Sequence, residues 1–275
     1  MAKDLGMKHK YIKTKTLSFY NKCFASRKHG HIDVVIPTTD KDLNKLSLVI
    51  PSLANIQHHI DNIYLVAPDS DFIRGFCNKY NCTFIDENTV LDITVKDIDY
   101  KPCGMDRSGW IFQQLLKLNC DKICKNEYIL VADSDTVFTR KQFFVKRNKM
   151  VFDCSDEYHA PYFTSYKKLL GLNKRFALSF VAHHMLFKKS FLSEMKQKIE
   201  EYTHKKWVDA IIDNLDPAQT SSFSEYETYG NYMYYNHRKY MIIREWYNKS
   251  IVFTEYDKIP NKNKYKTVSM HSYNE

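Results

Sequence analysis

The chain has 275 residues, of which 44% are hydrophobic and 27% are charged. These proportions are ordinary for a globular protein, and they exclude a disordered or a collagen-like chain. A formal net charge of +9 favours acidic partners: nucleic acid, an anionic membrane surface or a phosphorylated small molecule.

The first 30 residues are a basic extension and do not have the pattern of a signal peptide. Residues 1–20 are polar and lack an apolar core segment, and no apolar run in the chain reaches the ~18 to 20 residues that span a bilayer. Seven cysteines at irregular spacing favour free thiols in a reducing compartment. We therefore expect a cytoplasmic protein without a transmembrane helix, in which residues 1–30 associate with the acceptor or peripherally with a membrane surface.

The next part of the chain alternates strand-length apolar runs with helix-length amphipathic runs, which is typical of parallel β-α-β units. The expected strands are 33–37, 63–66, 82–85 and 128–132, and the expected helices are 41–56, 71–80 and 108–124. Pro51 should bend or divide the first of these helices. Because the strand at 128–132 is apolar throughout, we expect it to be covered on both faces.

The second half of the chain is less regular. We expect a strand at 149–152 and helices at 190–201, 206–214 and 224–235. No repeat, low-complexity tract or Gly/Pro-rich linker divides the chain, so residues 31–275 are expected to form a single α/β domain. Its central sheet should be mostly parallel and flanked by helices.

Two aspartates, Asp133 and Asp135, directly follow the apolar strand at 128–132. In an open parallel sheet, ligands bind beyond the carboxyl ends of the strands. Mg²⁺ and Mn²⁺ are typically held by one or two carboxylates together with substrate phosphates. An isolated Asp-x-Asp is most often a solvated turn, but its position after this strand predicts a metal site.

Three segments together resemble the GT-A nucleotide-sugar glycosyltransferases, and in particular a group of uncharacterised bacterial and viral glycosyltransferase-like proteins. They are Ile36-Pro37-Thr38, the helix Arg107-Ser108-Gly109-Trp110-Ile111-Phe112-Gln113-Gln114-Leu115-Leu116-Lys117-Leu118, and Val131-Ala132-Asp133-Ser134-Asp135. The resemblance covers residues 33–137, and beyond them only residues 224–230 and His271.

The resemblance implies a Rossmann-like GT-A fold, with a nucleotide-sugar-binding half at 31–139 and an acceptor-side half at 140–275. It implies a hexosyltransferase-like enzyme (EC 2.4) that depends on Mn²⁺ or Mg²⁺. The donor would be a nucleotide diphosphate sugar, with a UDP-sugar first among the candidates. The acceptor would be a glycan, a lipid-linked sugar or a protein, and we expect transfer with inversion.

The resemblance also implies roles for single residues at the metal. Asp133 would lie near the donor ribose or the metal, and Asp135 would bind the metal. His271 would complete the metal shell, unless it is a surface residue of the C-terminal tail.

Further residues are implied for the nucleotide pocket. Thr38 and Thr39 would line it, unless they form a plain turn. Arg107, Trp110 and Gln113 would face the site, although Trp110 could equally belong to the core. On the same helix Lys117 could contact phosphate, but a lysine on a helix is more often a solvated charge.

Inverting transfer needs a carboxylate that removes the acceptor proton. Glu225 and Glu227 cannot both face one site, because helical residues two apart point about 200° apart. Ser224 and Glu227 have the spacing of a capping box, which leaves Glu225 as the predicted base. His184, in an apolar run with its neighbour His183, is the next candidate.

Two other interpretations stay open. A nucleotidyltransferase also places carboxylates beside a nucleotide on an α/β sheet, but residues 37–40 contain no glycine or arginine for the phosphate loop of that class. A basic nucleic-acid-binding module fits the net charge, but the lysines are scattered and no zinc-finger or RNP-like motif occurs. Nucleic acid is therefore not expected as a partner, and the oligomeric state stays open.

Overall fold

The computed structural model of the protein describes residues 30–271. Apart from Gly30, the basic extension expected at 1–30 lies outside the described residues. The six described cysteines carry free thiols, as expected: Cys77, Cys82, Cys103, Cys120, Cys124 and Cys154.

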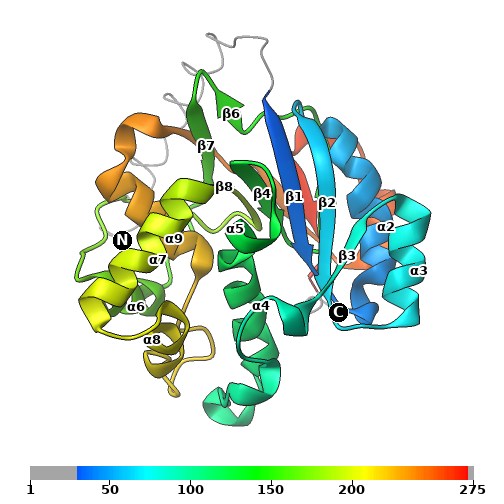
Figure 1. Cartoon of the computed structure of the whole chain (residues 1–275). Coiled ribbons are helices and arrows are strands. Elements are labelled where there is room, and N and C mark those ends of the chain that lie inside the picture. Colours follow the sequence, from blue (N-terminus) through cyan, green and yellow to red (C-terminus); the bar gives the residue numbers. More distant parts are fainter. Residues whose placement is uncertain (1–29, 272–275) are drawn as a thin grey trace.

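A five-stranded sheet in the order β3-β2-β1-β4-β8 forms the centre of the molecule (Figure 1). Its strands are β1 (His31–Pro37), β2 (His59–Ala67), β3 (Thr83–Asp86), β4 (Tyr128–Ala132) and β8 (His184–Lys188). The first four are parallel, and β8 runs antiparallel beside β4. β1 and β4 are buried along nearly their whole length, because apolar side chains face both sides. The predicted α/β fold with a mostly parallel central sheet is confirmed.

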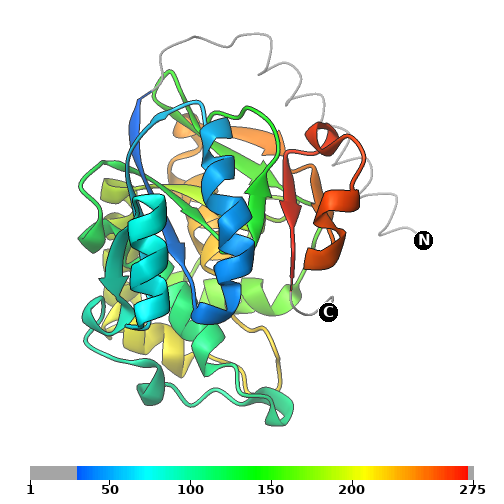
Figure 2. The same cartoon turned by 90° about the vertical axis from the view of Figure 1, so that its right-hand side faces the viewer.

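Helices lie on both sides of this sheet (Figure 1, Figure 2). Helices α2 (Leu43–Ser52) and α3 (Asp71–Tyr80) lie together on one side. On the other side, α9 (Glu225–Asn236) contacts α4 (Ser108–Leu118), α6 (Ala160–Leu170) and α7 (Lys189–Thr203), and the short helices α5 (Cys120–Ile123) and α8 (Trp207–Asp213) pack against α7. Among residues 30–271, no helix combines the length and the apolar character that crossing a membrane requires.

Two of the predicted helices end earlier than expected. Pro51 lies in the last turn of α2, and a 3₁₀ turn follows at Leu53–Asn55, so the predicted division at this proline is confirmed. The helix predicted at 108–124 is interrupted at Asn119, whose backbone leaves the helical region (φ −97°, ψ 8°). The Asn119 side chain donates to the Val90 carbonyl at 2.6 Å, and after this break the chain continues as the short helix α5.

Two three-stranded sheets complete the second half of the chain. One contains β5 (Thr136–Phe138), β10 (Asn248–Ser250) and β11 (Thr267–Ser269), and the other contains β6 (Val145–Lys146), β7 (Lys149–Cys154) and β9 (Met241–Glu245). Of these strands only β7 was predicted. The strands β5, β6, β10 and β11 have only two or three residues each and carry little periodic signal, and β9 was also not predicted. Helix α6 and strand β8 were not predicted either.

Candidate active site

The carboxyl ends of β1 and β4 and the start of β8 meet at one edge of the central sheet. Asp133 directly follows β4, and the antiparallel pairing of Ala132 with His184 brings His183 beside it. The Asp133 N–H donates to the His183 carbonyl at 2.9 Å. His183 has a left-handed backbone with φ 55°, which is uncommon for a residue with a Cβ atom. In this conformation its Nδ1 atom lies 3.0 Å from Asp133 Oδ2.

His271 reaches the same edge through the small sheet of β5 and β11. The two strands are antiparallel, and the Met270 N–H donates to the Asp135 carbonyl at 3.0 Å. His271 Nδ1 then lies 3.0 Å from Asp135 Oδ2. Its ring is centred 4.3 Å from the ring of His183. A residue of the C-terminal segment therefore belongs to this site and is not a free surface histidine.

Asp135, His183 and His271 form a candidate metal cluster, because one ligand atom from each lies within 4.8 Å of the others. One carboxylate with two imidazoles suits Mn²⁺ better than Mg²⁺, which is usually bound through oxygen atoms. The structure brings together the predicted Asp135 and His271 and adds His183. Asp133 lies beside the cluster, hydrogen-bonded to His183.

A buried cation, Lys117, lies behind Asp133. Its Nζ atom is 2.5 Å from Asp133 Oδ1 and 2.8 Å from Glu225 Oε1. The Tyr226 hydroxyl donates to Asp133 Oδ1 at 3.0 Å, and the Glu225 N–H donates to the side chain of Gln114 at 3.2 Å. The Lys117 side chain is 4% exposed, so it is not a solvated helix lysine. Helices α4 and α9 are joined here through a network that ends at Asp133.

These contacts determine the charges of the network. Burial alone would raise the pKa of Asp133, but the Lys117 ammonium and the His183 ring outweigh it and hold that pKa well below its usual range. Burial alone would lower the pKa of Lys117, but Asp133 and Glu225 raise it above its ordinary value. Burial and the Asp133 charge raise the pKa of Tyr226. At neutral pH, Asp133 is therefore an anion, Lys117 a cation and Tyr226 a neutral donor.

A cavity of about 380 Å³ lies where β1 ends and α4 begins. Its walls include four residues predicted for the nucleotide pocket, namely Thr38, Thr39, Trp110 and Gln113, together with Pro37, Glu87, Val95, Gly109, Phe112 and Leu116. The fifth, Arg107, places its guanidinium 4.4 Å from the centre of the Trp110 ring. Its buried Nε atom has no hydrogen-bond partner among the described residues. The structure therefore brings all five residues to one place.

The two predicted catalytic residues lie below the surface. The Glu225 side chain is 4% exposed and is held by Lys117. His184 lies in the core, where its Nε2 atom is 2.9 Å from Asp153 Oδ2. The structure does not bring His184 to the Asp135 cluster, and its neighbour His183 occupies that place.

The capping box predicted at the start of α9 forms only in part. Ser224 accepts the Glu227 N–H at 3.2 Å, so the predicted N-cap is confirmed. The Glu227 carboxylate does not return to Ser224. It accepts instead from the Asn231 side chain at 2.6 Å and from the Phe180 N–H at 3.3 Å, because buried backbone and amide donors of the core offer it stronger partners than a helix end.

Tyr226 is a site residue that the sequence did not reveal, and the sequence did not predict that Lys117 would be buried against Asp133 or that His183 would join the cluster. For Lys117 a signal exists: it lies among leucines on a helix that is apolar on nearly every side, and a buried charge needs a partner. For His183 and Tyr226 there is none, because their positions depend on the pairing of β4 with β8 and on the packing of α4 against α9.

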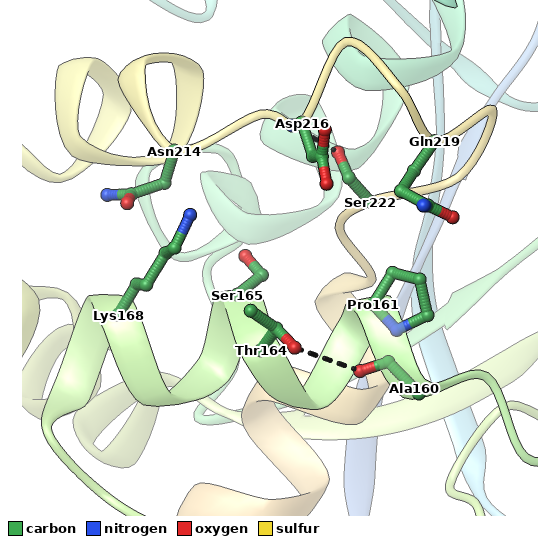
Figure 3. A pocket seen from close by; sticks show the side chains of 9 residues that line it. All are labelled: Ala160, Pro161, Thr164, Ser165, Lys168, Asn214, Asp216, Gln219 and Ser222. Atoms are coloured by element: carbon green, nitrogen blue, oxygen red, sulfur yellow. Dashed lines mark hydrogen bonds between the residues drawn. The ribbon is translucent and has the colours of Figure 1, made fainter.

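A smaller cavity of about 180 Å³ lies between α6 and the segment 214–222 (Figure 3). Its lining is mostly polar and includes Ser165, Lys168, Asp216 and Ser222. The Tyr100 hydroxyl donates a hydrogen bond to Ser222 Oγ at 2.9 Å and so connects this segment to the loop that precedes α4. None of the predicted site residues lines this cavity.

Comparisons with known proteins give one family and several solved structures. The model of a family of unknown function (DUF6492) matches residues 29–272. The chain is similar to the galactosyltransferase LgtC, solved in complex with donor and acceptor sugar analogues, at 12% identity and a TM-score of 0.48, with 86% of each chain covered. No curated protein matches the chain.

Two longer structures are also similar. The glycosyltransferase GlyE in Streptococcus pneumoniae TIGR4 has 16% identity and a TM-score of 0.44, over 89% of this chain and 55% of GlyE. The bifunctional glycosyltransferase WbbM has 12% identity and a TM-score of 0.46, over 87% of this chain and 45% of WbbM.

Proposed function

The chain belongs to DUF6492, a family of unknown function, and we propose that it is a metal-dependent glycosyltransferase that moves a sugar from a nucleotide diphosphate sugar to a glycan, lipid or protein acceptor. One observation carries the proposal. The cluster of Asp135, His183 and His271 and the cavity lined by Thr38 and Trp110 lie at the same carboxyl edge of a parallel sheet. Open α/β sheets bind nucleotides at this edge.

The cluster fits a divalent ion, and we propose Mn²⁺. When bound, such an ion supplies positive charge to the departing diphosphate. The chain prepares the ligands by hydrogen bonding: His183 Nδ1 is engaged with Asp133 Oδ2, which leaves Nε2 as its ligand nitrogen. A carboxylate in this outer position orients the ring and raises its basicity.

The cavity at the same edge of the sheet suits the nucleotide part of the donor. A volume of about 380 Å³ falls within the ~300 to 1,000 Å³ of ligand pockets. Trp110 offers an aromatic surface, and Thr38 and Gln113 offer hydrogen-bonding groups. Arg107, stacked on Trp110, adds a positive charge that suits a diphosphate. We propose a UDP-sugar as the first donor to test.

The burial of Glu225 bears on the reaction. A general base must come within hydrogen-bond reach of the acceptor hydroxyl, whereas Glu225 is 4% exposed and paired with Lys117. This geometry favours a positioning role, in which Glu225 holds Lys117 against Asp133. The Glu225→Gln variant separates the two roles: a base predicts a ~100- to 10,000-fold fall in kcat, and a positioning residue predicts a smaller fall with a changed donor affinity.

The activity is tested with the full chain, Mn²⁺ and a panel of UDP-, GDP- and ADP-sugars. Glycosyl transfer, or slow hydrolysis without acceptor, releases a nucleoside diphosphate, whereas a nucleotidyltransferase releases or consumes pyrophosphate. Donor binding at ~100 times Kd should stabilise the protein by roughly 2.7 kcal/mol, visible as a rise in Tm. No binding of any nucleotide diphosphate would refute the proposal. The anomer of the product, read by NMR, tests the predicted inversion.

A further inference from the structure

A second cluster of metal-ligand side chains lies at the opposite edge of the central sheet, at the amino ends of β1 and β2 (upper part of Figure 1). His31 begins β1, His59 begins β2, and the two residues pair directly across the parallel strands. Asp61 stands two residues after His59 at a β-bulge, because the register shifts here from the pair Ile32–Ile60 to the pair Asp33–Asn62. The pairing of two strands, and not a loop, brings the three side chains together.

The three side chains converge on one oxygen atom. His31 Nδ1 lies 2.9 Å and His59 Nδ1 lies 2.7 Å from Asp61 Oδ1, and the two imidazole rings are centred 4.7 Å apart. Asn126 donates from its side chain to the other carboxylate oxygen, Oδ2, at 2.8 Å. The carboxylate is therefore held in place from a neighbouring segment, as the ligands of metal sites commonly are.

We propose that His31, His59 and Asp61 bind a divalent transition-metal ion such as Zn²⁺. Two imidazoles and one carboxylate are a common ligand set for Zn²⁺, and three protein ligands leave the fourth tetrahedral position to water. An aspartate carboxylate is charged at neutral pH, where free imidazole is largely neutral and able to bind a metal.

The site is open to an ion from solution. The His31 and His59 side chains are 65% and 68% exposed, so both rings can turn outward until each nitrogen lies ~2.0 to 2.1 Å from the ion. A bound ion would join the first residues of two neighbouring strands and would stabilise this edge of the sheet. The proposal does not rest on the proposed function, because the two clusters occupy opposite ends of β1.

The test is a titration of the metal-free full chain with Co²⁺, whose visible absorption reports tetrahedral binding. It is made in an Asp135→Ala background, so that the cluster at the active edge lacks its carboxylate. We expect one Co²⁺ to bind, and Zn²⁺ to displace it and raise the Tm. Adding His59→Ala should weaken binding by at least ~10-fold, as should Asp61→Asn, which keeps the shape but loses the charge.

The matched control is His204→Asn, which changes another exposed histidine at a left-handed position that asparagine tolerates, and it should leave Co²⁺ binding unchanged. Circular dichroism verifies that each variant is folded. The assignment is wrong if the Asp135→Ala protein binds no Co²⁺, or if His59→Ala leaves its binding curve unchanged. Because binding is read without any substrate, its failure is distinct from a failure of the proposed glycosyl transfer.

Discussion

Two aspartates of this protein, Asp133 and Asp153, have nearly the same kinds of partners but different access to solvent. The Asp133 side chain is 21% exposed and contacts Lys117, His183 and Tyr226. Asp153 is fully buried and is surrounded by three basic groups, from His184, Arg244 and Lys266. Part of the Asp133 carboxylate therefore remains accessible to a ligand, whereas Asp153 is in contact only with residues of the core.

The adjacent residues His183 and His184 divide between these two clusters. His183 belongs to the open edge of the sheet, and His184 belongs to the core cluster that joins β7, β8 and β9. The comparison teaches that access to solvent, and not residue type, distinguishes a candidate active site from a structural ion cluster. It also predicts that substituting an aspartate mainly lowers stability at the core cluster and mainly lowers activity at the open edge.

The largest effect is expected at the closed cluster. Asp153→Asn removes the negative charge that contacts Arg244 and Lys266 in the core, and breaking such a buried pair typically costs ~3 to 5 kcal/mol. Urea unfolding of the variant should show this loss in the free energy of unfolding. Asp257→Asn, at a side chain that is 96% exposed, is the matched control. Equal stability of the two variants would contradict the structural role.

At the open edge, the effect should fall on activity. Asp135→Ala removes a proposed metal ligand, and the fall in kcat/KM should exceed the ~10- to 100-fold that the loss of an outer partner costs. The unfolding free energy should change by less than ~1 kcal/mol, because the carboxylate lies at the end of a strand and contributes little to the core. A full loss of folding would indicate a structural role instead.

Lys117 and Lys196 sharpen the comparison further. Both are buried lysines paired with an aspartate at 2.5 Å, Lys117 with Asp133 and Lys196 with Asp121. Lys117→Met and Lys196→Met should lower the unfolding free energy by similar amounts. Only Lys117→Met should lower kcat/KM, by ~10-fold, because it releases Asp133 from its position beside His183. Equal activity of both variants, measured at a temperature where both are folded, would remove Lys117 from the site.

The smallest effect concerns pH and the closed cluster. Burial lowers the pKa of Lys266 to about 7 from 10.5. Between these values the unfolded chain binds a proton that the folded chain does not, so stability should rise with pH above about 7, by at most ~1.4 kcal/mol per unit. Urea unfolding at pH 7 and 8 should show a slope of this sign, and Lys266→Met should remove that contribution. An unchanged slope in the variant would show that another group causes it.

The sequence alone determined the elements that depend on local pattern. The apolar run that became β4 and the aspartates directly after it predicted both the sheet and the edge where the candidate site lies, because period and composition are local properties. The residues at the end of β1 and the start of α4, such as Thr38 and Trp110, were predicted from the resemblance and do line one cavity.

Only the tertiary structure decided which residues complete the site. His183 reaches Asp133 because β8 pairs antiparallel with β4, Lys117 is buried because α9 packs on α4, and Glu225 is withdrawn from solvent by its ion pair with Lys117. His31 and His59 meet at the other edge through strand register. Contacts between segments far apart in the chain depend on which surfaces pack together, and a single sequence carries no periodic signal for that choice.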